Sequence, residues 1–234
     1  MAYNITGVET FDNKRNKVTL DYGEVTFLLY KGECRQLHIG LTEAAAGRDT
    51  DVNAAGTGRK TGAGAAVRRE LSDEEYAAIK ADILVPRAKK RVLYFMKNAD
   101  KTRHQIRQKL KEGFYPDEVI DEVMRFLDRY GFADDKQYAE NYVEELKGSR
   151  SRREIEAKLM QKGLRAADIR AELEAVSPED EAAACERALR KKYPHGLPED
   201  ADPAERRKAF AYLARRGFSF ETIETAVQEV SYGR

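Results

Sequence analysis

The chain has 234 residues, of which 35 % are charged and 9 % aromatic, and it contains no tryptophan. This composition favours long, solvated helices around a thin core over one large globular core. No run approaches 18 apolar residues, which excludes a membrane-spanning helix, and the first residues lack the apolar segment of an export signal. Cys34 and Cys185 share no motif, so we expect reduced thiols in a cytoplasmic protein.

The net charge of +1 conceals an uneven distribution. Residues 87–132 carry 12 basic and 7 acidic side chains, whereas the segments 1–86, 133–177 and 178–234 are each slightly acidic. Tight binding to DNA depends on many phosphate contacts, so this balance argues against a high-affinity DNA-binding protein. It favours a protein partner.

Residues 1–41 are predicted to form a small β-rich module. The segments 5–11, 17–21 and 25–30 are rich in β-branched, aromatic and large apolar residues and are separated by turn-like residues. Residues 33–40 fit a short helix or a strand.

The composition changes at residues 42–70, where glycine and alanine dominate, and we predict a flexible insertion or linker there. Its glycines do not form a P-loop, because Arg59 separates Gly58 from Lys60. They do not form a dinucleotide-binding motif either, because Gly62 lies one residue too late. The segment 71–86 is then predicted as a connecting helix that begins at a capping box, Ser72 to Glu75, and ends at Pro86.

The rest of the chain contains an internal repeat. Four columns of apolar residues align without gaps in three copies: Ile106, Ile155 and Ala209; Leu110, Leu159 and Leu213; Ile120, Ile169 and Ile223; Leu127, Val176 and Val230. Their spacing is that of helix faces, interrupted by glycine-bearing turns. We therefore predict three-helix repeats at 87–132, 133–177 and 178–234. The predicted fold class is mainly α, with three tandem three-helix repeats that form an elongated curved body and a small N-terminal β-rich module.

Helix caps occur at equivalent positions of the three copies. Thr102 with Gln105, and Ser151 with Glu154, have the spacing of capping boxes. In the third copy, Asp202 supplies the cap and a proline follows it at the first helical position.

Catalytic chemistry has little support in this sequence. The three histidines, His38, His104 and His195, fall in different segments, and no His-x-x-x-His or Cys-x-x-Cys pair is present. Asp134 and Asp135 have the residue type that a Mg²⁺-dependent nuclease requires, but a helix N-cap also explains them. We therefore expect no enzyme activity, no metal and no cofactor.

Basic residues recur near the start of the second helix of every copy, and stacked copies would align them into a binding stripe. A solvated helix face is the alternative explanation for each cluster taken alone. The candidate partner-binding residues are Lys89, Lys90, Arg91, Arg103, Arg107, Lys109 and Lys111 in the first copy, Arg150, Arg152, Arg153, Lys158 and Lys162 in the second, and Arg206, Arg207, Lys208, Arg215 and Arg216 in the third.

The stretch 131–164, GFADDKQYAENYVEELKGSRSRREIEAKLMQKGL, resembles the signature of the RecX family. That signature begins with Gly-apolar-x-Asp-Asp, continues with an aromatic and a small residue, and closes on basic, Ile, Leu, Lys-Gly and apolar positions. Here the matching residues are Tyr138, Ala139, Arg153, Ile155, Leu159, Lys162, Gly163 and Leu164. The resemblance covers residues 67–234 well and 1–41 loosely. Two departures are Phe114, which stands at the position of Gly163, and the insertion at 42–66.

The resemblance implies a non-enzymatic protein that docks along the groove of a RecA filament on DNA, suppresses ATP turnover and strand exchange, and favours disassembly. Its implied partners are the RecA filament and, more weakly, single- or double-stranded DNA, and we expect a monomer. Two alternatives stay open: a helix-turn-helix-like DNA-binding protein that acts without RecA, and a metal-dependent nuclease that uses Asp134 and Asp135.

Overall fold

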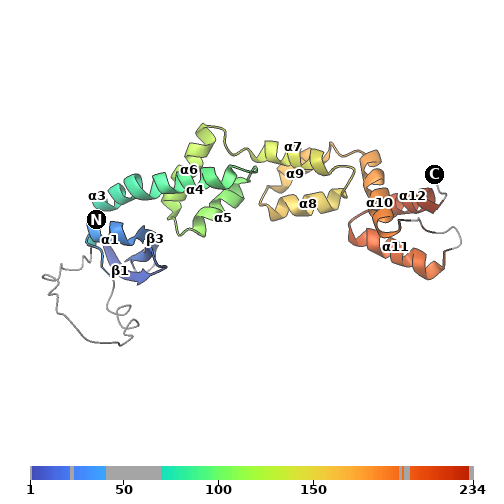
Figure 1. Ribbon diagram of the computed structural model, residues 1–234. Helices are drawn as coiled ribbons and strands as arrows, with labels where there is room; N and C mark the ends of the chain where they lie inside the picture. Colours follow the sequence, from blue (N-terminus) through green and yellow to red (C-terminus); the bar gives the residue numbers. More distant parts are fainter. Residues whose placement is uncertain (1, 22–23, 41–69, 195–196, 198–200, 232–234) are drawn as a thin grey trace, which may run out of the picture. The chain divides into compact units, whose positions relative to one another are not determined.

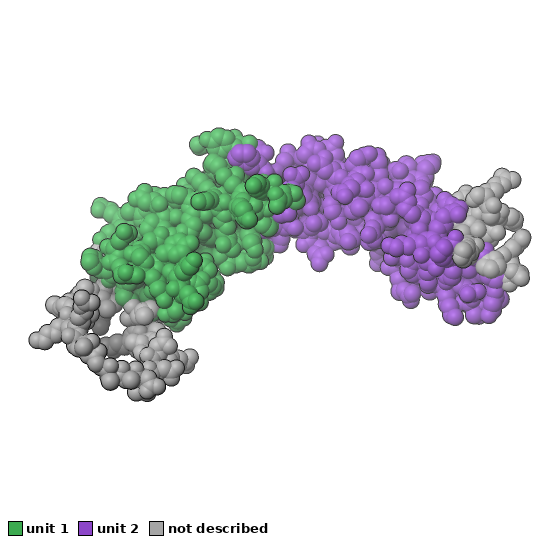
Figure 2. Space-filling model, viewed as in Figure 1, with its two compact units in different colours: residues 1–99, 106–130 green, residues 100–105, 131–234 purple. Residues whose placement is uncertain are grey.

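The computed structural model describes residues 2–21, 24–40, 70–194, 197 and 201–231 (Figure 1). They form two compact units, one from residues 1–99 and 106–130 and the other from residues 100–105 and 131–234 (Figure 2). The predicted linker lies outside the described residues except for Glu70, and so does His195.

The N-terminal module is a four-stranded antiparallel sheet. Three of its strands match the predicted strand-like segments, whereas the fourth comes from residues 70–72, which were predicted to belong to the linker and the connecting helix. Its strands are β1 (Ala2–Thr10), β2 (Arg15–Leu20), β3 (Val25–Tyr30) and β4 (Glu70–Ser72), in the order β3-β2-β1-β4. Val18 pairs with Val8 on one side and with Phe27 on the other, and all three are buried. Residues 33–40, which fitted either a helix or a strand, contain most of the short helix α1 (Lys31–Gln36).

One helical run connects the sheet to the first repeat. It begins at α3 (Asp73–Ala78), where Ser72 and Glu75 form the predicted capping box, and passes through a π-helical turn (Ile79–Leu84) into α4 (Val85–Met96). Pro86 was expected to end the helix, but the helix continues through this residue. In the wider turn the Val85 amide donates to the carbonyl of Lys80, five residues earlier, and such a turn accommodates the proline ring and its missing N–H.

The sheet module packs directly on the first repeat within the first unit. The Arg87 guanidinium on α4 donates to the Leu28 carbonyl oxygen at 2.9 Å, pairs with Glu33, and lies over the Tyr30 ring at 4.7 Å. This arginine bonds a backbone acceptor of β3 and neutralises a partly buried carboxylate, and thereby fixes α4 to the sheet.

Three three-helix repeats follow, as predicted, and they make the described chain mainly helical. The first consists of α4, α5 (Arg103–Lys111) and α6 (Asp117–Arg129), the second of α7 (Asp135–Leu146), α8 (Arg152–Gln161) and α9 (Ala166–Leu173), and the third of α10 (Pro178–Lys192), α11 (Pro203–Arg215) and α12 (Phe220–Ser231). Eleven of the twelve aligned apolar residues are at most 1 % exposed. The twelfth, Val230, lies in α12, and its side chain is outside the described part of the structure.

The second helices are joined end to end by hydroxyl groups at their N-caps. Ser151, before α8, accepts a hydrogen bond from the Glu154 amide and donates one to the Arg216 carbonyl oxygen at the end of α11, at 2.5 Å. Thr102, before α5, accepts from the Gln105 amide and donates to the Lys162 carbonyl at the end of α8, at 2.6 Å. Both hydroxyl-bearing residues are completely buried.

These joints explain the glycines that follow α8 and α11. Gly163 and Gly217 have φ angles of +83° and +91°, a conformation that side chains disfavour. A β-carbon on Gly163 would lie 2.3 Å from His104 Cβ, and one on Gly217 would lie 2.8 Å from Arg153 Cβ. In the first repeat the equivalent residue is Phe114, with φ of +56°, and its ring packs against Phe11 of the sheet at 5.4 Å.

We predict that Gly163→Ala destabilises the protein much more than Gly131→Ala. Both glycines have positive φ, so alanine at either position costs about 1 kcal/mol in backbone strain. Only Gly163 faces a joint, where the added methyl group also clashes with His104 and costs about 1–3 kcal/mol more. Urea unfolding followed by circular dichroism measures both. Equal losses in the two variants would show that the joint is not tightly packed, because nothing lies within 4 Å of a β-carbon on Gly131.

Candidate functional site, an arginine-lined hollow

Most of the basic residues predicted in the first repeat are neutralised by carboxylates of the same unit. The ion pairs are Lys89–Glu122 at 3.9 Å, Arg107–Asp121 at 2.8 Å, Lys109–Glu112 at 3.0 Å and Lys111–Asp117 at 3.6 Å. Of the other three, Lys90 is exposed, whereas Arg91 and Arg103 are partly buried. The basic residues of the first repeat therefore do not form a continuous stripe of uncompensated positive charge.

Two of the candidates in the second repeat hold the fold together. The Arg152 guanidinium donates to the Val176 carbonyl oxygen at the end of the repeat, and its Nε lies 3.7 Å from Glu181. The Lys162 ammonium lies over the Tyr138 and Tyr142 rings, at 5.6 and 5.3 Å, and these rings stack on each other.

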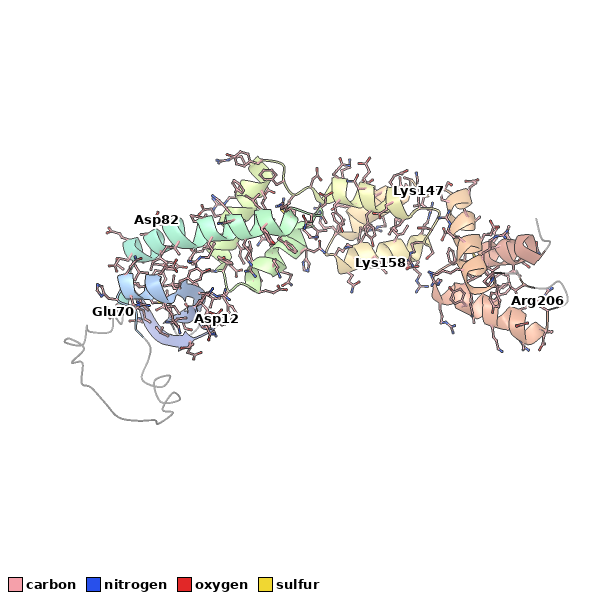
Figure 3. All side chains as sticks on the ribbon, viewed as in Figure 1. Asp12, Glu70, Asp82, Lys147, Lys158 and Arg206 are labelled. Atoms are coloured by element: carbon pink, nitrogen blue, oxygen red, sulfur yellow. The ribbon has the colours of Figure 1, made fainter. Side chains whose placement is uncertain are left out.

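Several candidates of the second and third repeats lie elsewhere on their helices. Lys158 lies on α8 and Arg206 on α11 (Figure 3). Both residues are partly buried, whereas Lys208 is exposed. The Arg207 Nε donates to the Pro203 carbonyl of its own helix at 3.1 Å. None of these four residues lines the hollow described next.

Four predicted residues do come together, on one hollow of about 580 Å³ within the second unit. It lies where the N-terminal part of α8 meets the C-terminal end of α11. Its walls are Arg150, Arg153, Glu154 and Ala157 from the second repeat and Ala214, Arg215, Arg216 and Gly217 from the third. The two repeats thus contribute two arginines each.

The charges of this hollow are only partly compensated. Arg150 pairs with Glu154 at 2.7 Å, and the Arg216 guanidinium lies over the Tyr212 ring at 5.0 Å. Arg153 and Arg215 are exposed, and neither has an ion pair with any residue that the structure describes. With four guanidinium groups and one carboxylate, the lining has an excess of three positive charges.

The joint between α11 and α8 sets this arrangement. The Ser151 bond to the Arg216 carbonyl brings the end of α11 against the first turn of α8, which carries Arg153. Sequence analysis did not identify Ala157, Ala214 and Gly217, whose small size leaves room between the arginines. The sequence signal for the two alanines is that each precedes a basic residue, Lys158 and Arg215 respectively.

Arginines arranged in this way suit an anion with several acceptor oxygens. A guanidinium group is planar, keeps its charge across the physiological pH range, and binds carboxylate or phosphate through two parallel hydrogen bonds. The hollow is open and shallow rather than enclosed, so it fits groups on the surface of a macromolecule.

The carboxylates that a nuclease would need are engaged in the fold. Asp134 caps α7, accepting from the amides of Lys136 at 2.9 Å and Gln137 at 3.1 Å, as the N-cap interpretation predicted. Asp135 accepts from the Arg103 amide at 2.8 Å. Among the residues described, no three His, Cys, Asp or Glu side chains lie close enough to hold a metal ion.

Two further features bear on the class of protein. Both cysteines are buried and unpaired, and burial raises the pKa of Cys34 and raises that of Cys185 to about 12, so neither is an activated thiolate. In the part of the chain that the structure describes, no helix has the length and apolar character that crossing a membrane requires.

Comparison with known proteins agrees with this architecture. Three family models match, described as the first, second and third three-helix domains of RecX, over residues 88–127, 134–173 and 179–227 respectively. Together they cover more than half of the chain. The Regulatory protein RecX of Clostridium acetobutylicum is 32 % identical over 146 residues, which cover 61 % of this chain and 68 % of that protein.

Other relatives extend the match. The Regulatory protein RecX of Chlorobium phaeobacteroides is 34 % identical over 55 % of this chain and 83 % of its own length. A crystal structure of regulatory protein RecX has the same fold, with a TM-score of 0.57 at 21 % identity over 97 % of this chain and 99 % of that chain. The matched domains, the repeats and the relatives together show that this chain belongs to the RecX family of regulatory proteins.

Proposed function

We propose that this protein is a cytoplasmic, monomeric, non-enzymatic regulator that binds RecA filaments on DNA and restrains their ATP hydrolysis and strand exchange. In the cell this activity would moderate recombination and DNA repair. Membership of the RecX family supports a regulatory role. The named partner follows from the resemblance of residues 131–164 to the family signature.

The observation that carries the proposal is the arginine-lined hollow. Arg153 and Arg215 are exposed cations whose charge no described carboxylate neutralises, and they lie on one concave surface. Burying an unpaired arginine in an interface is unfavourable because the charge loses its water. These two arginines therefore contribute to binding only when the partner places acidic groups opposite them. We assign the hollow to acidic side chains on the surface of a filament protomer.

The remaining candidate residues have a secondary role in this proposal. Residues 87–132 keep an excess of basic over acidic side chains, 12 against 7, when their ion pairs are counted. This excess, which includes Lys90, adds together with Lys208 to a positive field that speeds encounter with the anionic filament. Rim charges of this type change the association rate and its salt dependence more than they change the lifetime of the complex.

We predict that the protein lowers ATP hydrolysis by RecA on single-stranded DNA and that Arg153→Glu with Arg215→Glu removes most of this effect. The double substitution reverses two charges on the hollow, and each such contact in an interface centre is worth about 2 kcal/mol. The concentration for half-inhibition should therefore rise at least about 30-fold, the change that the loss of one such contact alone gives. A coupled ATPase assay measures it.

A matched control is Arg170→Glu with Arg187→Glu, which makes the same change in net charge at two exposed arginines of the same unit that do not line the hollow. This variant should inhibit like the unaltered protein. Equal loss in both variants would mean that only net charge matters. DNA binding that falls steeply with salt, without any effect on RecA, would instead support a DNA-binding protein that acts alone.

We also predict that alanine substitutions of the adjacent residues Arg152 and Arg153 change the free energy of unfolding by different amounts. Arg152→Ala should destabilise the protein by about 1–3 kcal/mol, because it leaves the Val176 carbonyl without its donor and Glu181 without its cation. Arg153→Ala should change stability by less than about 0.5 kcal/mol, as is usual for an exposed side chain. Thermal unfolding of the two variants tests this. A neutral Arg152→Ala would show that its bonds contribute nothing, and Arg152 would then regain its place among the partner-binding candidates.

A further inference from the structure

The arginine-lined hollow keeps its positive charge when no filament is bound. Its lining carries four guanidinium groups against one carboxylate, in a volume of about 580 Å³. That volume falls within the range of about 300–1,000 Å³ that is usual for small-molecule sites. Guanidinium groups gathered in this way repel one another, so an anion that neutralises several of them at once is stabilised there.

Two of the four guanidinium groups are held in place by contacts within the fold. Arg150 pairs with Glu154 at 2.7 Å, and the Arg216 guanidinium lies over the Tyr212 ring at 5.0 Å. The same ring attracts a further cation, because the Lys192 ammonium lies 4.4 Å from its centroid. These contacts restrict the side chains before a ligand arrives, which lowers the conformational entropy that binding would cost.

The other two arginines and the small residues of the lining leave room for a ligand. Arg153 and Arg215 are exposed, and neither has an ion pair with a residue that the structure describes. The Arg153 side chain lies close over Gly217, where a β-carbon would come within 3.2 Å of its Cδ. Ala157 and Ala214 likewise add only methyl groups to the lining. The hollow therefore has space beside its two uncompensated cations.

A chain of directly linked phosphates matches this set of groups better than the other common anions. Each phosphate offers charged oxygens to a guanidinium fork, and successive phosphates share one bridging oxygen atom. A nucleic-acid strand separates its phosphates by a sugar, so it brings fewer charges into a hollow of this size. A single carboxylate brings one negative charge against an excess of three positive charges.

We propose that the arginine-lined hollow is also a binding site for a polyphosphate chain, with Arg153 and Arg215 as its main ligands. The triphosphate of a nucleotide and inorganic polyphosphate share this chemistry, and the open hollow is reached directly from solvent. If the hollow binds acidic side chains of the filament, a bound polyphosphate excludes them and relieves the inhibition. This regulation, unlike the binding itself, rests on the function proposed above.

Isothermal titration calorimetry of the full-length protein with sodium tripolyphosphate, at constant ionic strength and without RecA, DNA or magnesium, tests the site. Arg153→Ala with Arg215→Ala should weaken the affinity at least about ten-fold, because two of the four charge-assisted contacts are lost. Arg153→Lys with Arg215→Lys should also weaken it, since an ammonium group lacks the planar fork that binds phosphate through two hydrogen bonds. Far-ultraviolet circular dichroism checks the fold of each variant.

A variant with the same loss of charge elsewhere is Arg170→Ala with Arg187→Ala, two exposed arginines of the same unit that do not line the hollow. Its affinity for tripolyphosphate should be unchanged. Three results would overturn the proposal: no measurable binding of tripolyphosphate, equal loss of affinity in this variant, or stronger binding of oligothymidine than of tripolyphosphate at equal phosphate concentration. The last result would assign the hollow to nucleic acid instead.

A titration with ATP distinguishes the two sources of the phosphate chain. Tighter binding of ATP than of tripolyphosphate assigns the site to a nucleotide, and tighter binding of tripolyphosphate assigns it to an inorganic chain. Both results support the proposal, whereas binding of adenosine as tight as that of ATP would contradict it, because adenosine carries no phosphate.

The filament assay separates this site from the proposed function. Tripolyphosphate at ten times its dissociation constant in the assay buffer should raise the concentration for half-inhibition about ten-fold, with RecA alone at the same tripolyphosphate concentration as the reference. Binding of tripolyphosphate by a protein that does not inhibit RecA would reject the proposed function and keep the site. Inhibition of RecA by a protein that binds no tripolyphosphate would reject the site and keep the proposed function.

Discussion

The repeats depend on one hydroxyl group at each joint that serves two helices at once. The ends of a helix leave amides at one terminus and carbonyls at the other without partners, and burying them unpaired is unfavourable. Ser151 accepts from an amide of α8 and donates to the last carbonyl of α11, so a single completely buried side chain satisfies both ends. A serine or threonine hydroxyl suits this position because one small oxygen atom both accepts and donates. The glycine after each carbonyl follows from the same close approach.

The geometry of the arginine-lined hollow follows from that joint. A helix start that carries arginines is brought against a helix end that carries arginines, and the Ser151 hydroxyl bond is one of the contacts that hold them together. The compensation is selective: Glu154 neutralises Arg150, whereas Arg153 and Arg215 keep their charge at the surface. Like charges held close on a rigid support are an arrangement that a complementary partner stabilises.

The sequence predicted what depends on local periodicity. The apolar columns, the capping hydroxyl of Ser151 and the N-cap at Asp134 could all be predicted, because each is set by residues two to ten positions apart. The continuation of the helix through Pro86 could not be predicted, since a π-helical turn depends on packing. The sequence also could not separate Arg152 from Arg153. Adjacent arginines on a helix point about 100° apart, and only the tertiary structure shows that one meets Val176 and Glu181 while the other meets solvent.

The start of α11 and the end of α5 lack the groups that make the joint. At the N-cap of α11 stands Asp202, whose carboxylate accepts from the Ala204 amide but has no proton to donate to the carbonyl of another helix. After α5 stands Phe114 in place of glycine, and its ring is taken up by Phe11 and by the Lys17 ammonium at 5.5 Å. A further copy would need a hydroxyl at the first position and a glycine at the second. The two departures from the repeat pattern, which look like irregularities in the sequence, therefore fall at the two helix ends that form no joint of this kind among the described residues.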